Sequence, residues 1–301
     1  MHDNFGLLRF RESIIIKSII ILPASYILKS IPARWLLGLF SLCTIMTSCI
    51  AQNKATTART DYKLNADVFY GIDDFDNLFY SKDNVLYKRP AAGNAQPMEF
   101  YDVQLGDLTS VDLINPLRAC LFYKDSQTVV LLDNRLNESV RISLNELEPY
   151  RYIEHARLAG ERRLWLYNQD QQRLELYDYI QDKLIVASPV VKSQVNQMLS
   201  DYNYCHLFTG DQVITFNNYA SRTGVLSTGA AVLADFDFDK LVLLNDDGWR
   251  AYRFNKDYIF EPLDDWLPEN MPQAAESFYL KSGKLYIYRQ NQIEVHTTNQ
   301  D

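Results

Sequence analysis

A β-hairpin pattern that returns about every 43 residues constrains the fold more than any other feature of this 301-residue sequence. Each copy has a short apolar or alternating run, a turn rich in Asp, Asn or Gly, and a second such run. Runs of this length between turn residues are typical of β-strands, so the sequence predicts an all-β fold. The copies are marked by a residue near the end of the first run: Tyr80, Tyr123, Tyr167, Phe208, Asn245 and Tyr288.

Six copies of this length match the blades of a β-propeller, which hold four strands in roughly 40–50 residues. A lone hairpin is too small to bury its apolar face, whereas radial stacking buries it against both neighbours. We therefore predict a six-bladed propeller over residues 67–301, closed by pairing of a strand near 68–70 with the final hairpin. The alternative is a two-sheet β-sandwich with evenly spaced strands.

The N-terminal region has the pattern of an export signal. Residues 35–51 carry no charge, follow Lys29 and Arg34, and end in small and polar residues. A basic region, an apolar run and a processing site indicate a secretory signal over residues 1–51, and a retained membrane anchor is the alternative. Residues 52–66 are polar and threonine-rich, which predicts a flexible tether.

Two processing sites compete at the end of the apolar run. Thr47, Ser48 and Cys49 resemble a loose lipobox, which predicts lipidation of Cys49. Cleavage between Ala51 and Gln52 is the alternative. No acidic cluster follows Cys49. Such clusters resemble the surface-export tags of Bacteroidota lipoproteins, so their absence favours the periplasmic side of an outer membrane over the cell surface.

The export signal and the blade repeat together resemble those of uncharacterised propeller-type lipoproteins and secreted proteins of the Bacteroidota envelope. The resemblance implies no catalytic residues. We expect a non-enzymatic scaffold that docks an envelope or outer-membrane protein on one propeller face, in outer-membrane assembly or secretion, with a lipid anchor in the membrane. The alternative is a glycan-binding or glycan-acting propeller. An apolar loop patch would favour protein docking, whereas acidic residues and aromatics at the channel mouth would favour a glycan.

Charge and motifs narrow the function further. Residues 52–301 contain 36 acidic and 25 basic side chains, a formal charge of −11, which disfavours nucleic acid as a partner. The Gly-x-Ser-x-Gly spacing of a nucleophile elbow is absent, and His155, His206 and His296 occur singly. We therefore predict no catalytic residue, no metal and no cofactor.

Two acidic segments have competing interpretations. Residues 73–77 fit either a calcium site or a self-capping Asx turn, and the turn is favoured. Residues 235–239 alternate Asp with Phe like the start of an EF-hand, but Lys240 stands where its glycine is needed. That alternation predicts a half-buried strand whose aspartates face water.

Two segments interrupt the repeat. Residues 189–199 have apolar spacing that fits one or two helical turns. Residues 262–276 form a long, proline-punctuated excursion, which is the predicted partner-binding element because loops on a rigid scaffold often carry function. In the alternative, its tryptophan folds back as a lid over a neighbouring blade. The predicted partner-binding residues are Leu263, Trp266, Leu267 and Met271.

Overall fold

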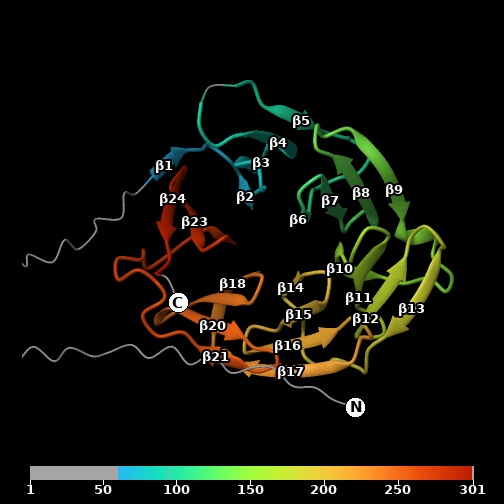
Figure 1. The fold of residues 1–301 in the computed structure, drawn as a ribbon. Helices are drawn as coiled ribbons and strands as arrows, with labels where there is room; N and C mark the ends of the chain where they lie inside the picture. Colours follow the sequence, from blue (N-terminus) through green and yellow to red (C-terminus); the bar gives the residue numbers. More distant parts are fainter. Residues whose placement is uncertain (1–59, 94, 300–301) are drawn as a thin grey trace, which may run out of the picture. The chain divides into compact units, whose positions relative to one another are not determined.

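The computed structural model describes residues 60–93 and 95–299, which belong to a compact unit spanning Thr57–Asp301. These residues form six separate four-stranded antiparallel sheets. Figure 1 shows the sheets as blades of a ring, which confirms the predicted six-bladed propeller over the sandwich. No helix in this described part is long and apolar enough to cross a membrane. The predicted signal over residues 1–51, with Cys49, lies outside the described residues.

Each blade has the same strand order, from the ring axis outward. Blade 6 alone takes its fourth strand from the other end of the chain. The strands are, for blade 1, β2–β5 (Val68–Ile72, Asn77–Lys82, Val85–Pro90, Met98–Phe100); for blade 2, β6–β9 (Ser110–Asn115, Arg118–Tyr123, Thr128–Asp133, Glu138–Ser143); for blade 3, β10–β13 (Ile153–Leu158, Arg163–Asn168, Arg173–Asp178, Lys183–Ala187); for blade 4, β14–β17 (Gln197–Ser200, Tyr204–Phe208, Gln212–Asn217, Arg222–Ser227); for blade 5, β18–β21 (Ala231–Asp237, Lys240–Asn245, Gly248–Phe254, Phe260–Pro262); and for blade 6, β22–β24 (Ser277–Lys281, Lys284–Arg289, Gln292–Thr297) with β1 (Thr60–Lys63).

The predicted hairpins are the second and third strands of the blades. Their apolar residues pack between blades in six clusters, one for each pair of neighbouring blades. In blade 3, for example, Leu164 and Leu166 pack toward blade 2, whereas Trp165 and Tyr167 pack toward blade 4. Because side chains alternate along a strand, each sheet feeds two clusters, and this is the radial stacking that the repeat predicts.

Closure of the ring differs from the prediction. The strand that pairs with β24 is β1, with Thr60 opposite Val295 and Lys63 opposite Gln292. Residues 68–70, predicted to close the ring, instead lie in β2, the innermost strand of blade 1. The predicted tether at residues 52–66 therefore has to be corrected from residue 60 onward. The outermost strand of a blade needs few apolar residues, which is why its sequence resembles a linker.

The helical turns predicted for residues 189–199 are also wrong. This connection is extended and leads into β14, and Val191, Val195 and Met198 are buried between blades 3 and 4. The spacing of these apolar residues marks the places where an irregular chain contacts the seam between the two blades. In a segment this short, such spacing can match the period of a helix by chance, which is why the prediction failed. Cys120 and Cys205 are both free and buried.

Candidate functional site

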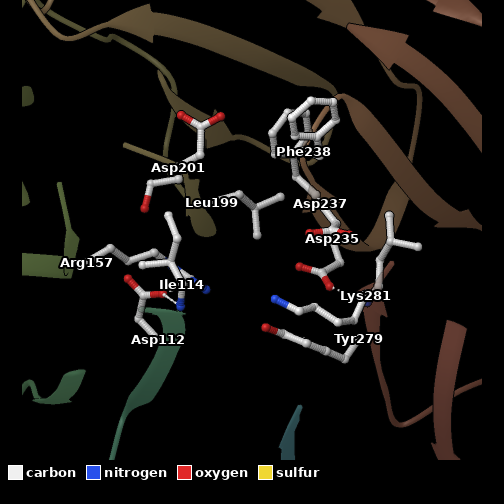
Figure 2. A pocket seen from close by; sticks show the side chains of 13 residues that line it. Asp112, Ile114, Arg157, Leu199, Asp201, Asp235, Asp237, Phe238, Tyr279 and Lys281 are labelled. Atoms are coloured by element: carbon white, nitrogen blue, oxygen red, sulfur yellow. Dashed lines mark hydrogen bonds and ion pairs between the residues drawn. The ribbon is translucent and has the colours of Figure 1, made fainter. Parts of the chain in front are cut away.

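The candidate site is a cavity of about 200 Å³ at the centre of the ring. Its walls come from the first strands of blades 2–6 and from the loops that follow them. We call the connections between the first and second strands the inner loops. They surround one mouth of the ring, because every first strand runs in the same direction. Figure 2 shows Asp112 and Arg157 on one side of the cavity and Asp235 and Tyr279 across from them.

Four residues of the cavity wall occupy the same position in four blades. Asp112, Arg157, Asp235 and Tyr279 each pair with the third residue of the second strand of their own blade. In blade 1 this position is Gly71, and a Cβ atom there would lie 2.6 Å from the Tyr279 ring. Glycine at this position therefore leaves the room that the tyrosine ring occupies.

Two of these four residues join neighbouring blades by the same bond. Asp112 Oδ2 accepts a hydrogen bond from the Leu158 N–H of blade 3 at 2.8 Å. Asp235 Oδ2 accepts one from the Leu280 N–H of blade 6 at 2.6 Å. A charge-assisted bond to a backbone amide is stronger than a neutral one, so both carboxylates fix the spacing of adjacent first strands.

The charge environment of the two aspartates differs. Arg157 Nη1 lies 3.7 Å from Asp112 Oδ1, which gives this nearly buried carboxylate a cation from the next blade. The equivalent position beside Asp235 holds Tyr279, which carries no positive charge. Burial is the largest cause that raises the pKa of Asp235, to about 7.

The cavity wall as a whole has an excess of carboxylates. Burial also raises the pKa of Asp201 and that of Asp237. Over residues 60–93 and 95–299, no cation lies within ion-pair distance of Asp201, Asp235 or Asp237. Lys281 also lines the cavity, but its Nζ atom lies 2.7 Å from Asp74 Oδ1 of blade 1. The cavity is therefore suited to a group that brings positive charge or hydrogen-bond donors.

Exposed apolar side chains surround this mouth of the ring. Four of the six inner loops carry one: Phe75 is 59% exposed, Leu117 59%, Tyr202 41% and Phe238 86%. We call these four residues the apolar rim. Large apolar side chains at equivalent loops on one face are typical of a surface that packs against another molecule.

A second, open cavity of about 670 Å³ adjoins the first and shares Asp237 and Phe238 with it. It extends over the inner loop of blade 6 to Trp266 and to residues 297–299. Phe238 thus lies at the junction of two hollows, one at the ring axis and one at the seam between blades 5 and 6.

The four predicted partner-binding residues lie together in that seam. Trp266 is only 6% exposed and packs against Val242, Ala251 and Leu280. Leu263, Leu267 and Met271 are partly buried against the same cluster. Trp266 thus has the packing position that was the alternative to a partner contact, and it is not available to a partner as the loop stands. A binding role for the exposed parts of the other three stays a prediction.

The loop is held at both ends of the seam. The Trp249 Nε1–H donates to Pro272 O at 2.6 Å, and the Asn299 N–H donates to Trp266 O at 2.8 Å. The excursion is thus anchored to the third strand of blade 5 and to the segment after β24. It serves the blade interface rather than standing free of it.

The prediction for the acidic segment at residues 73–77 is confirmed, whereas that for residues 235–239 needs a correction. Asp73 Oδ1 accepts hydrogen bonds from the Phe75 and Asn77 amides, both at 2.9 Å, which confirms the Asx turn. The aspartates of residues 235–239 do not all face bulk water as predicted: Asp235 and Asp237 line the central cavity. The physical reason is that the first strand of a blade faces the ring axis. Within the described part of the chain, no three His, Cys, Asp or Glu side chains form a metal-binding group.

Comparisons with known proteins support the fold. No protein-family model and no curated protein matches the sequence. A chain of the mitotic checkpoint complex matches with a TM-score of 0.53 and 6% identity, over 79% of this chain and 93% of that one. The Pan2 WD40 domain of Neurospora crassa matches with a TM-score of 0.52 and 8% identity, over 78% and 75%. BamB from Moraxella catarrhalis matches with a TM-score of 0.45 and 9% identity, over 74% and 70%. At these identities the likeness concerns the propeller fold and leaves the function open.

Proposed function

We propose that this propeller is a non-enzymatic scaffold of the cell envelope that docks a protein partner on its inner-loop face. The observation that carries the proposal is the apolar rim, because four equivalent loops expose Phe75, Leu117, Tyr202 and Phe238 around one mouth. Aromatic side chains at the centre of a contact surface are the residues most often found in binding hot spots. The exposed parts of Leu263, Leu267 and Met271, in the excursion at residues 262–276, would add a second contact at the adjoining seam.

The test is capture of a partner with matched variants of the two faces. A triple variant, Phe75→Ser, Leu117→Ser and Phe238→Ser, removes most of the rim and should stay folded because the three side chains are exposed. The control is Val103→Ser, since Val103 is 76% exposed in the connection between blades 1 and 2, on the opposite face. Capture from detergent-solubilised envelopes followed by mass spectrometry should lose the partner only in the triple variant. Loss in the control alone would contradict the choice of face.

The envelope location rests on the sequence of residues 1–51. Export through this signal, with lipidation at Cys49, would leave the propeller tethered on the periplasmic side of an outer membrane. Palmitate labelling of the wild type and of Cys49→Ser tests the anchor. Label that persists in the variant would rule out Cys49, and a mature N-terminus at Gln52 would indicate secretion by the other processing site.

A glycan ligand is the second candidate, favoured by the aromatic Tyr202 and Phe238 beside the carboxylates of the cavity. Aromatic faces stack on sugar rings, and a carboxyl group with a pKa near 7, as at Asp235, is suited to general acid catalysis on a glycosidic bond. Calorimetric titration with neutral and acidic oligosaccharides tests this function. Binding that is lost in Phe238→Ala would support it, and no binding to any of them would leave protein docking as the function.

A further inference from the structure

The seams between blades 2 and 3 and between blades 5 and 6 share an aspartate that bonds to the backbone of the next blade, but they differ in the side chain beside that aspartate. In both seams, an aspartate in the first strand of one blade accepts a hydrogen bond from a backbone N–H in the first strand of the next blade. Beside Asp112 the next blade supplies Arg157, whereas beside Asp235 it supplies Tyr279. A buried carboxylate needs a counter-charge or full hydrogen bonding. Asp235 accepts a hydrogen bond at Oδ2 from the Leu280 N–H but has no ion pair among the described residues.

The two cations of the cavity wall act on these carboxylates only from a distance: Arg157 lowers the pKa of Asp235 and Lys281 that of Asp237, but neither forms an ion pair with them. The Lys281 Nζ atom lies 2.7 Å from Asp74 Oδ1. Arg157 lies across the cavity from Asp235, beside Asp112, as Figure 2 shows. Asp201 and Asp237 add two further carboxylates without an ion pair among the described residues. A cation that enters the cavity would therefore be attracted by three carboxylates that have no ion pair within the described residues.

The dimensions of the cavity limit what can enter. A cavity of about 150 Å³ in another protein holds one benzene molecule, so about 200 Å³ accommodates one long side chain but no folded segment. The flanking parts of such a ligand would meet the apolar rim, in which Phe238 is 86% exposed. The formal charge of −11 over residues 52–301 would also speed the approach of a basic surface.

We infer that the central cavity receives a single lysine or arginine side chain from an exposed loop of the protein partner, and that apolar residues on either side of it pack on the rim. This inference rests on the proposed docking function and adds the chemistry of the contact. The basic group lies beside Asp235, where its charge takes the place that Arg157 has beside Asp112.

The experiment uses two synthetic peptides and the purified mature protein. Acetyl-Gly-Phe-Arg-Phe-Gly-amide carries the basic group, and the same peptide with citrulline for arginine is a neutral control of nearly the same shape. Calorimetry at pH 8 and low salt should show binding of the arginine peptide at least about 10-fold tighter than of the citrulline peptide. A tenfold difference corresponds to about 1.4 kcal/mol, within the range of one desolvated charge contact.

Three variants locate the contact. Asp235→Asn keeps an acceptor for the Leu280 N–H but removes the charge, and should weaken the arginine peptide about 10-fold or more. Tyr279→Arg supplies an internal cation at the position equivalent to Arg157 and should weaken it similarly. Asp125→Asn removes a charge from an exposed turn on the opposite face and should leave affinity within about 2-fold.

The outcomes separate this inference from the docking function. Equal affinity for the two peptides, or no binding of the arginine peptide at about 1 mM, overturns the inference. Partner capture that is lost in the rim variant but unchanged in Asp235→Asn also overturns it, and leaves protein docking in place. Capture that survives both changes overturns protein docking on this face. Binding of a neutral oligosaccharide that competes with the arginine peptide overturns the choice of a protein partner.

Discussion

The seams between blades 2 and 3 and between blades 5 and 6 are built with different amounts of apolar material. The first buries 13 apolar residues, mostly from strands, together with Leu144 and Leu147 from the short connection between the blades. The second buries only six, and the largest of them, Trp266, comes from the long excursion. A connection can thus supply the volume that the strands of a seam lack, and here it does so beside the open cavity.

Replacement of Trp266 is the most severe test of that difference. Trp266→Ala removes the largest buried side chain of the smaller cluster and should lower the free energy of unfolding by about 3–5 kcal/mol. Urea denaturation measures it, with Leu144→Ala in the other seam as the matched control, expected at about 2–5 kcal/mol. A loss below about 0.5 kcal/mol for Trp266→Ala would show that the seam closes without the loop.

Asp235, the carboxylate of the smaller seam that has no ion pair among the described residues, should itself cost stability. The pKa of Asp235 is about 7 in the folded protein and close to 3.8 when unfolded, so the unfolded chain ionises first as the pH rises. Asp235→Asn should therefore be more stable than the wild type at pH 8, by about 1–3 kcal/mol, because access of water reduces the full value of about 4 kcal/mol. The charged or titratable groups that line the cavity with Asp235 are Asp112, Arg157, Asp201, Asp237, Tyr279 and Lys281.

The pH dependence distinguishes this effect from ordinary repacking. The difference between Asp235→Asn and the wild type should shrink as the pH falls from about 7 towards 3.8. In this range the folded wild-type carboxyl is protonated while the unfolded one is still ionised, so each fall in pH reduces the advantage that ionisation gives the unfolded chain. Denaturation curves at pH 8, 6 and 4 would measure the change. A difference that is the same at every pH would contradict the raised pKa.

The paired carboxylate of the larger seam should respond in the opposite direction. Arg157→Met leaves Asp112, which is 3% exposed, without its cation and should lower stability at pH 8 by about 1–2 kcal/mol. The loss is less than for a fully buried pair, because the Arg157–Asp112 distance is 3.7 Å and Asp112 keeps its bond to Leu158. Arg157→Lys should recover part of it. An unchanged unfolding midpoint for Arg157→Met would show that the cation has no stabilising role.

The smallest stability effect is expected at the exposed rim. Phe238→Ser should change the free energy of unfolding by no more than about 0.5 kcal/mol, since the ring is 86% exposed. Thermal melting checks this, and the same preparation serves for partner capture. A large loss of stability would place Phe238 in the fold rather than in a contact surface.

The sequence predicts the hairpins and their radial arrangement well, but it misses the ring of cavity residues. The apolar runs around Tyr123 and Tyr167 can be recognised as copies of one repeat because both faces of these strands are buried, so nearly every residue in them is apolar. Asp112, Arg157, Asp235 and Tyr279 precede the hairpin markers Tyr123, Tyr167, Asn245 and Tyr288 by 11, 10, 10 and 9 residues. The spacing to the paired residue of the second strand varies by one residue, and so does the position of the marker in that strand, so repeats aligned on their hairpins place these side chains out of register. Only the pairing of the first and second strands shows that these four residues occupy the same position in their blades.

The burial of Trp266 is a second property that the sequence does not predict. Its exposure depends on the path of a loop through the seam, and that path is set by bonds to Trp249 and Asn299 that are distant in sequence. The composition of the loop alone cannot distinguish a tryptophan that packs in a blade interface from an exposed one that binds a partner.

Pairing of β1 with β24 imposes an order of events on folding. Among the described strands, β1 is synthesised before all the others, whereas its partner β24 is synthesised after them. Contacts between such distant segments form slowly, so β1 spends this interval as an unpaired edge. Its sequence is Thr-Asp-Tyr-Lys, and charged residues on an unpaired strand discourage association with the wrong chain. The polar composition that makes this strand resemble a linker is thus also what protects it until its partner has been synthesised.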